Sequence, residues 1–106
     1  MEVHSKLGSG FLEKVYENSL MLLFRREGIA AKQQAPVKVC FEGEIVGEYR
    51  ADILVDEKIV LELKTADKVV DIHRAQMLHY LQATGIKLGM ILNFGSKNFE
   101  YERLVL

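Results

Sequence analysis

The chain has 106 residues, a length that suits one domain whose core needs neither a disulfide nor a structural metal. Hydrophobic residues make up 49% and charged residues 27%, as in ordinary globular proteins. With a net charge of -1, the chain lacks the basic excess of many nucleic-acid-binding proteins. This does not exclude nucleic-acid binding, because a bound metal would reverse the local field of an acidic site.

No apolar run approaches the roughly 18 residues of a membrane span, and no signal-peptide pattern opens the chain. We therefore expect no membrane partner. The single cysteine, Cys40, excludes an internal disulfide and fits a reducing, cytoplasmic location. Because Cys40 lies in a strand-like run, we expect it to be a packing residue.

The first part of the chain predicts one helix followed by an extended segment. Apolar residues recur at helical spacing over about residues 9–27, where Ser9 can cap the start and Gly28 can end the helix. Residues 29–41 are typical of a strand. Pro36 within this segment predicts an edge position or a bend.

The rest of the chain predicts four strands and a second helix. Strands are expected at 45–55 and 58–64, a helix at 71–84, and two closing strands at 87–94 and 99–106. The connection through the second helix has the length of a crossover, so the strands at 58–64 and 87–94 are expected to be parallel neighbours. The predicted fold is a small mixed α/β sandwich with the order helix, three-strand meander, helix, two strands.

Two neighbouring strands of the meander carry charges that can meet. Glu62 and Lys64 point to the same face of their strand, and Asp52 has the same parity on the strand before. If these two strands pair through the turn between them, Asp52 and Glu62 lie side by side. Leu54 and Val60 share that face, which indicates a sheet covered on both sides.

Two carboxylates at cross-strand distance repel each other unless a proton or a cation lies between them. A divalent metal resolves the conflict, and a neighbouring ammonium can steady a developing negative charge. This is the chemistry of metal-assisted phosphodiester hydrolysis. The alternative is an amphipathic edge strand whose charged face is merely solvated, and the strand pattern alone leaves both interpretations open.

Further candidate residues lie on the two predicted helices. Glu13 and Tyr16 are three residues apart on the first, and Gln76 and Tyr80 are four apart on the second, so each pair shares a face. Taken alone, Glu13 is also explained as a surface residue near a helix N-terminus, Tyr16 as core, and Gln76 with Tyr80 as ordinary amphipathic-helix chemistry. The face that carries Leu78 and Leu81 is expected to pack into the core.

Together these features resemble the GxxExxY protein family, which is placed in the PD-(D/E)XK nuclease superfamily near the branch with RecB-like motifs. The resemblance extends from about residue 2 to residue 106. It is carried by five short motifs in order: Gly10-x-x-Glu13-x-x-Tyr16, Tyr49-Arg50-Ala51-Asp52, Glu62-x-Lys64, Gln76-x-x-x-Tyr80 and Leu92-Asn93-Phe94-Gly95.

The resemblance implies a restriction-endonuclease-like core and a metal-dependent active site. Carried over by position, the implied metal ligands are Asp52, Glu62, the Leu63 backbone carbonyl and Glu13. Lys64 would be the catalytic lysine. Gln76 and Tyr80 would support the site from their helix, and together with the three acids and Lys64 they make up the implied catalytic set. The oxygen-only ligand set suits Mg²⁺ or Mn²⁺.

The chain departs from the family at two places near its start. The family usually has a further helical segment before Glu2, so we expect a single domain over residues 1–106 that lacks part of its N-terminal helix. Ser9 stands where a proline is common. The expected function is hydrolysis of phosphodiester bonds in DNA, with a non-catalytic nucleic-acid- or protein-binding module as the alternative. A homodimer stays open, with the strand at 99–104 as a pairing edge.

Overall fold

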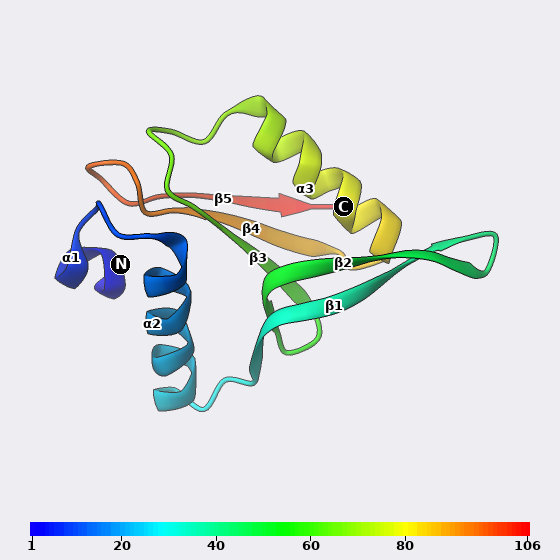
Figure 1. The fold of residues 1–106 in the computed structure, drawn as a ribbon, viewed down its shortest axis with the longest axis horizontal. Coiled ribbons are helices and arrows are strands. Elements are labelled where there is room, and N and C mark those ends of the chain that lie inside the picture. Colours follow the sequence, from blue (N-terminus) through cyan, green and yellow to red (C-terminus); the bar gives the residue numbers. More distant parts are fainter.

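A computed structural model describes all 106 residues as one five-stranded sheet with helices on both faces (Figure 1). The elements in chain order are α1 (Glu2–Leu7), α2 (Glu13–Arg26), β1 (Ala31–Phe41), β2 (Glu44–Val55), β3 (Ile59–Lys64), α3 (Asp71–Thr84), β4 (Leu88–Asn93) and β5 (Glu100–Val105). The mixed α/β fold class is confirmed, and from α2 onward the order is the predicted one, with the short helix α1 before it.

The sheet has the order β1-β2-β3-β4-β5. Strands β3 and β4 are parallel, in a register that runs from Ile59↔Leu88 to Lys64↔Asn93, and the other pairs are antiparallel. The predicted crossover through α3 is therefore confirmed. Strand β1 lies at an edge of the sheet, as Pro36 indicated.

Each face of the sheet has its own apolar core. On one face Leu20 of α2 packs with Ile53, Leu61 and Leu92. On the other face Met77 of α3 packs with the neighbouring strand residues Leu54, Val60 and Ile91, whose side chains point the opposite way. The expectation of a sheet covered on both sides is thus correct for the central strands.

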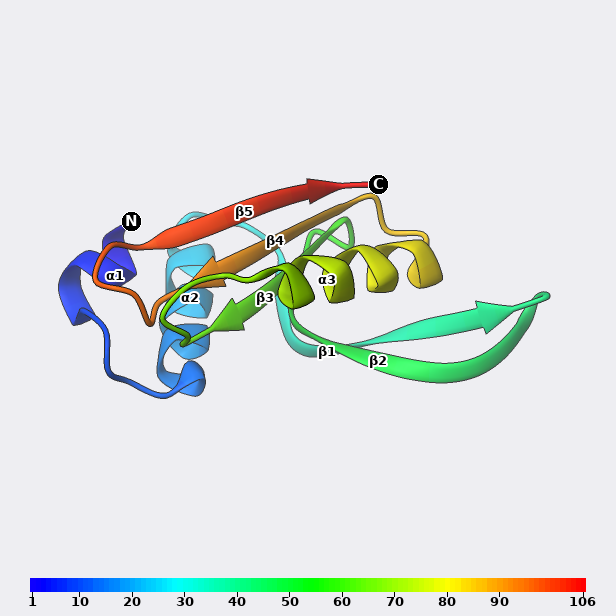
Figure 2. The ribbon, with the colours of Figure 1, turned by 90° about the horizontal axis from the view of Figure 1, so that it is seen from above.

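The β1–β2 hairpin extends beyond this body. Figure 2 shows it reaching past the end of α3. Its outer part exposes Phe41, Ile45 and Val46. Cys40 is also exposed there, so the expectation that Cys40 packs in the interior is wrong.

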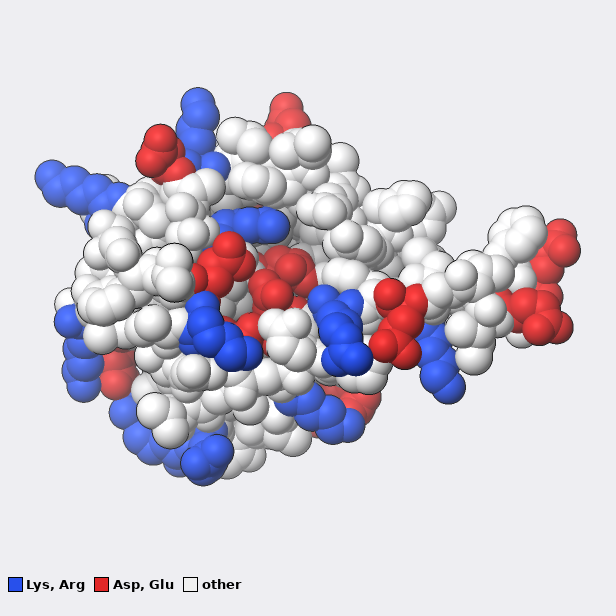
Figure 3. Space-filling view, in the orientation of Figure 1, with Lys and Arg blue, Asp and Glu red and all other residues white.

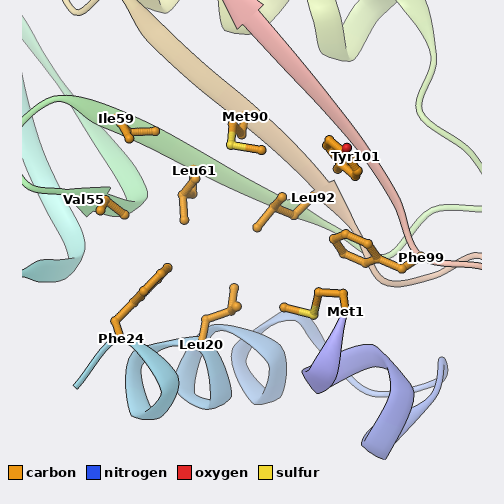
Figure 4. A pocket seen from close by; sticks show the side chains of 10 residues that line it. All are labelled: Met1, Leu20, Phe24, Val55, Ile59, Leu61, Met90, Leu92, Phe99 and Tyr101. Atoms are coloured by element: carbon orange, nitrogen blue, oxygen red, sulfur yellow. The ribbon is translucent and has the colours of Figure 1, made fainter. Parts of the chain in front are cut away.

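A groove with only apolar lining residues lies between α2 and the sheet, and its volume is about 480 Å³ (Figure 4). Leu20 and Phe24 of α2 face Leu61, Met90 and Leu92 across it. No helix of the chain is both long enough and apolar enough to cross a membrane.

Two local predictions need correction. Helix α2 begins at Glu13 rather than near residue 9, and Ser9 does not cap it, because Gly8 and Gly10 adopt φ values of 71° and 107° that break the helix. On α3 Leu81 is buried as expected, but its buried companion is Met77, whereas Leu78 is exposed.

Candidate active site

The candidate site lies where β2 and β3 separate. Their antiparallel pairing ends at Ile53↔Leu61, and the N–H of Leu63 donates to Oδ2 of Asp52 at 2.8 Å. Because the N–H and C=O groups of one strand residue point the same way, the Leu63 carbonyl also faces this opening. The register, continued by one residue, places Asp52 opposite Glu62, as the strand pattern predicts.

Strand β1 is irregular beside this opening. Gln34 has a φ of 49° and is absent from the β1–β2 register, in which it would lie opposite Asp52. Successive side chains of a regular strand point to opposite faces. Here both Gln33 and Gln34 donate to Glu17 of α2, at 2.7 and 2.8 Å, so the irregularity brings two amides to one carboxylate.

Glu17 is an acid that the sequence analysis did not single out. It is only 4% exposed, and besides the two glutamine amides it accepts a hydrogen bond from Lys14 at 2.7 Å. Burial raises the pKa of Glu17, but the hydrogen bonds from Lys14, Gln33 and Gln34 outweigh it and the net pKa is lowered. The available signal was its position four residues after Glu13, one helical turn along.

Tyr16 holds the start of α2 against the sheet. Its side chain is fully buried and its ring stacks on Phe94, which follows β4, with centroids 4.4 Å apart. Its hydroxyl donates to the Gly8 carbonyl at 2.7 Å and accepts the N–H of Phe11 at 3.2 Å. Tyr16 is thus core, and it fixes the helical turn that carries Glu13.

Glu62 is the acid that the fold satisfies least. Its Oε1 is buried and has no hydrogen-bond partner. The pKa of Glu62 is raised to about 7, mainly by burial. The charge of Lys64 and a hydrogen bond from the backbone of Asp52 lower this pKa in part, whereas the charges of Glu13 and Glu17 add to the rise. Burial thus favours the neutral form of this carboxyl, and nothing in the fold fully offsets the cost of its charge.

The pKa values of Asp52 and Glu13 are also raised, and burial is the main cause for both. Burial raises the pKa of Asp52 and the charge of Glu17 adds to this, against the N–H of Leu63 and the charge of Lys64. Burial also raises the pKa of Glu13, followed by the charge of Asp52, and Lys64 again lowers it. One ammonium thus acts on all three acids, which places them in one electrostatic unit.

A network of hydrogen bonds around the buried Asn93 holds the end of β3, where Lys64 lies. Asn93 is fully buried, and its Oδ1 accepts the N–H groups of Ala66 at 3.1 Å and Gly95 at 3.0 Å. The N–H of Phe94 donates to the Lys64 carbonyl at 2.9 Å. The Asn93-Phe94-Gly95 motif therefore fixes the backbone of the catalytic-lysine candidate and of the turn after it.

The surface view agrees with this arrangement. In Figure 3 acidic side chains gather in a hollow on the face shown, and basic side chains lie around it. The hollow is open to solvent on this side.

Gln76 and Tyr80 do not join this cluster. Gln76 donates to the hydroxyl of Tyr80 at 2.9 Å, and neither forms a hydrogen bond with the acids. The Tyr80 ring stacks on Tyr49, with centroids 3.8 Å apart and planes at 19°. Since Tyr49 precedes Asp52 on β2 by three residues, the pair supports the strand that carries this acid.

The donor set fits a hard divalent cation. No three His, Cys, Asp or Glu side chains are arranged as a metal-binding group in the structure. However, Asp52, Glu62, Glu13 and the Leu63 carbonyl are all oxygen donors, and Glu62 has a buried oxygen without a partner. A cation would lower the raised pKa values of these carboxyls and so resolve their mutual repulsion.

Comparison with known proteins shows a similar fold and a superfamily match. The chain is similar to the protein of the crystal structure of SSO0001, with a TM-score of 0.64 and 16% identity over 87% of this chain, a likeness of fold. The chain matches 48% of that protein, about half of its length. No match is found among curated proteins. The family described as the PD-(D/E)XK nuclease superfamily matches residues 1–104, and the chain belongs to this superfamily.

Proposed function

We propose that this protein is a metal-dependent nuclease that hydrolyses phosphodiester bonds in DNA. The observation that carries the proposal is the single electrostatic unit of Glu13, Asp52, Glu62 and Lys64 at the opening between β2 and β3. Membership of a nuclease superfamily, whose members generally use divalent metal ions, supports the same reaction class. The finer GxxExxY assignment stays a prediction.

In this proposal Asp52, Glu62, Glu13 and the Leu63 carbonyl hold Mg²⁺ or Mn²⁺. When bound there, such a cation would act as a Lewis acid toward the phosphate and would lower the pKa of a water molecule. Lys64 offsets the negative charge that develops on the phosphoryl oxygens. Glu17, whose oxygens already accept three hydrogen bonds, keeps α2 in place against β1.

The direct test is Lys64→Ala, assayed on linear and branched DNA with Mg²⁺ and with Mn²⁺. We expect cleavage to be abolished while the melting temperature changes little, since the Lys64 side chain forms no hydrogen bond or ion pair within the fold. Lys58→Ala is the matched control, because Lys58 lies on the exposed turn between β2 and β3. Undiminished cleavage by Lys64→Ala would refute the assignment.

The competing function is a non-catalytic module that binds nucleic acid or a protein and retains the nuclease fold. It is favoured by one observation, that no three acids are arranged as a metal-binding group. Thermal melting with and without Mn²⁺ separates the two. A metal site predicts a rise in melting temperature that the Asp52→Asn, Glu62→Gln double variant loses, and a non-catalytic module predicts no rise.

A homodimer also stays a prediction. Strand β5 pairs only with β4 and leaves its outer edge unpaired, which is the feature that would admit a second copy. Light scattering of the purified protein would give the oligomeric state.

A further inference from the structure

Two large apolar side chains stand exposed just before α2. Phe11 is 45% and Leu12 is 80% exposed, and neither belongs to the apolar core on either face of the sheet. Leu12 directly precedes Glu13, whose carboxyl interacts with Asp52 and Lys64. These two residues therefore form the turn that leads directly into the first turn of α2, which carries Glu13.

The backbone beneath them is held firmly. The N–H of Phe11 donates to the hydroxyl of Tyr16 at 3.2 Å, and that hydroxyl donates to the carbonyl of Gly8 at 2.7 Å. The Phe11 ring meets the Tyr16 ring edge to face at 6.1 Å. Because Tyr16 is fully buried, Phe11 is presented to solvent from a rigid base instead of a loose loop.

The β1–β2 hairpin also exposes apolar residues, but their neighbours in the chain are acidic. Phe41 and Ile45 are also exposed, but Glu42 and Glu44 lie between them in the chain. No cation is interleaved with these acids, so a phosphate backbone would be repelled there. The exposed apolar pair at Phe11 instead adjoins Glu13, one of the acids proposed to hold a cation. Lys14 follows Glu13, and although it is paired with Glu17, its side chain is 61% exposed.

We propose that Phe11 and Leu12 form a platform on which an unpaired nucleobase stacks while its neighbouring phosphate enters the acidic hollow. The inference rests on the proposed nuclease function and deepens it, because it assigns the substrate class. An aromatic face binds any exposed base. In an intact duplex both faces of each base are already stacked, so the platform selects strands with unpaired nucleotides.

The test is binding of a fluorescent single-stranded oligonucleotide, measured by anisotropy with Mg²⁺ in the Lys64→Ala background so that the strand stays intact. Three probes are compared: the strand itself, its blunt duplex, and the same strand with the bases removed. Phe11→Ala and Leu12→Ala are the test variants. Leu22→Ala is the control, because Leu22 is 62% exposed and lies about 13 Å further along α2.

We expect Phe11→Ala to weaken binding of the single strand about tenfold, as is usual for loss of a stacked base. Leu12→Ala should weaken it in the same direction, and Leu22→Ala should leave it unchanged. Binding of the base-free strand should be the same with and without Phe11. Phe11→Tyr, which keeps the ring, should restore affinity, and this rescue would separate stacking from a general loss of folding.

Equal weakening on the single strand and on the base-free strand would overturn the proposal, because Phe11 would then act on the backbone or on the fold. No weakening on either probe would overturn it as well. Cleavage of DNA by the unmodified protein is measured alongside. If the unmodified protein cleaves DNA and Phe11→Ala has no base-dependent effect on binding, the platform proposal fails and the nuclease proposal stands. If the unmodified protein does not cleave DNA, that result counts against the nuclease proposal itself.

Discussion

Replacing Glu62 by Gln tests whether its buried carboxyl, one oxygen of which has no hydrogen-bond partner, weakens the metal-free fold at neutral pH. Burial raises the pKa of Glu62 from 4.5 to about 7, and its Oε1 has no partner. At about 1.36 kcal/mol per pH unit, this difference corresponds to a loss of up to about 3 kcal/mol. Because the folded state binds this proton more tightly than the unfolded state does, the loss begins as the pH rises past 4.5 and is complete above about 7.

The Gln side chain does not ionise, so the two proteins should differ in pH dependence. Between pH 4.5 and mildly alkaline pH, the unmodified protein should lose up to about 3 kcal/mol relative to Glu62→Gln. For a chain of this length the melting temperatures should diverge on the order of 10 °C. Thermal unfolding followed by circular dichroism in chelator-treated buffers measures this divergence.

The control is Glu44→Gln, since Glu44 is exposed on the hairpin and forms no ion pair. It should leave the pH dependence of the unmodified protein unchanged. Added Mn²⁺ should remove the alkaline loss in the unmodified protein and have little effect on Glu62→Gln. Parallel pH curves for Glu62→Gln and the unmodified protein would refute the reasoning, because burial of the Glu62 carboxyl would then not control stability.

Two further substitutions test how the site is held, each by its effect on the free energy of unfolding in urea. Gly95→Ala should destabilise the protein by several kcal/mol, because a Cβ would lie 2.4 Å from the backbone after β3, whereas Gly47→Ala, with open space around it, should be tolerated. Tyr16→Phe should cost about 1–3 kcal/mol, since the Gly8 carbonyl and the Phe11 N–H lose their shared partner. A change below about 0.5 kcal/mol in either variant would contradict the role assigned to that residue.

Much of the fold could be predicted because the dominant signals are periodic. Alternation along two strands places Asp52, Glu62 and Lys64 on one parity, and this follows from strand geometry alone. The length of the connection through α3 predicts parallel β3 and β4, which the register confirms. Both inferences need only local spacing and the length of a connection.

The parts that could not be predicted depend on contacts between distant segments. The burial of Glu17 follows from the φ of Gln34, which turns two adjacent amides of β1 toward α2. Nothing in the local sequence around Gln34 marks this irregularity, because the alternation of a regular strand continues on both sides of it. The start of α2 was misplaced for a related reason, since Tyr16 stabilises a non-helical turn over Gly8 by bonds that a helical pattern does not reveal.

The four acids around the opening between β2 and β3, which are Glu13, Glu17, Asp52 and Glu62, fall into two kinds, and the difference argues for their roles. Glu17 accepts three hydrogen bonds that lower its pKa, so the fold already satisfies its charge. Glu13, Asp52 and Glu62 have raised pKa values, and repulsion from neighbouring acids contributes to each. A fold gains no stability from carboxyls kept in such surroundings. Such strain is typical of functional sites, and it is relieved when a cation binds. We therefore infer that Glu17 positions α2, and that the other three acids are the groups available to a metal.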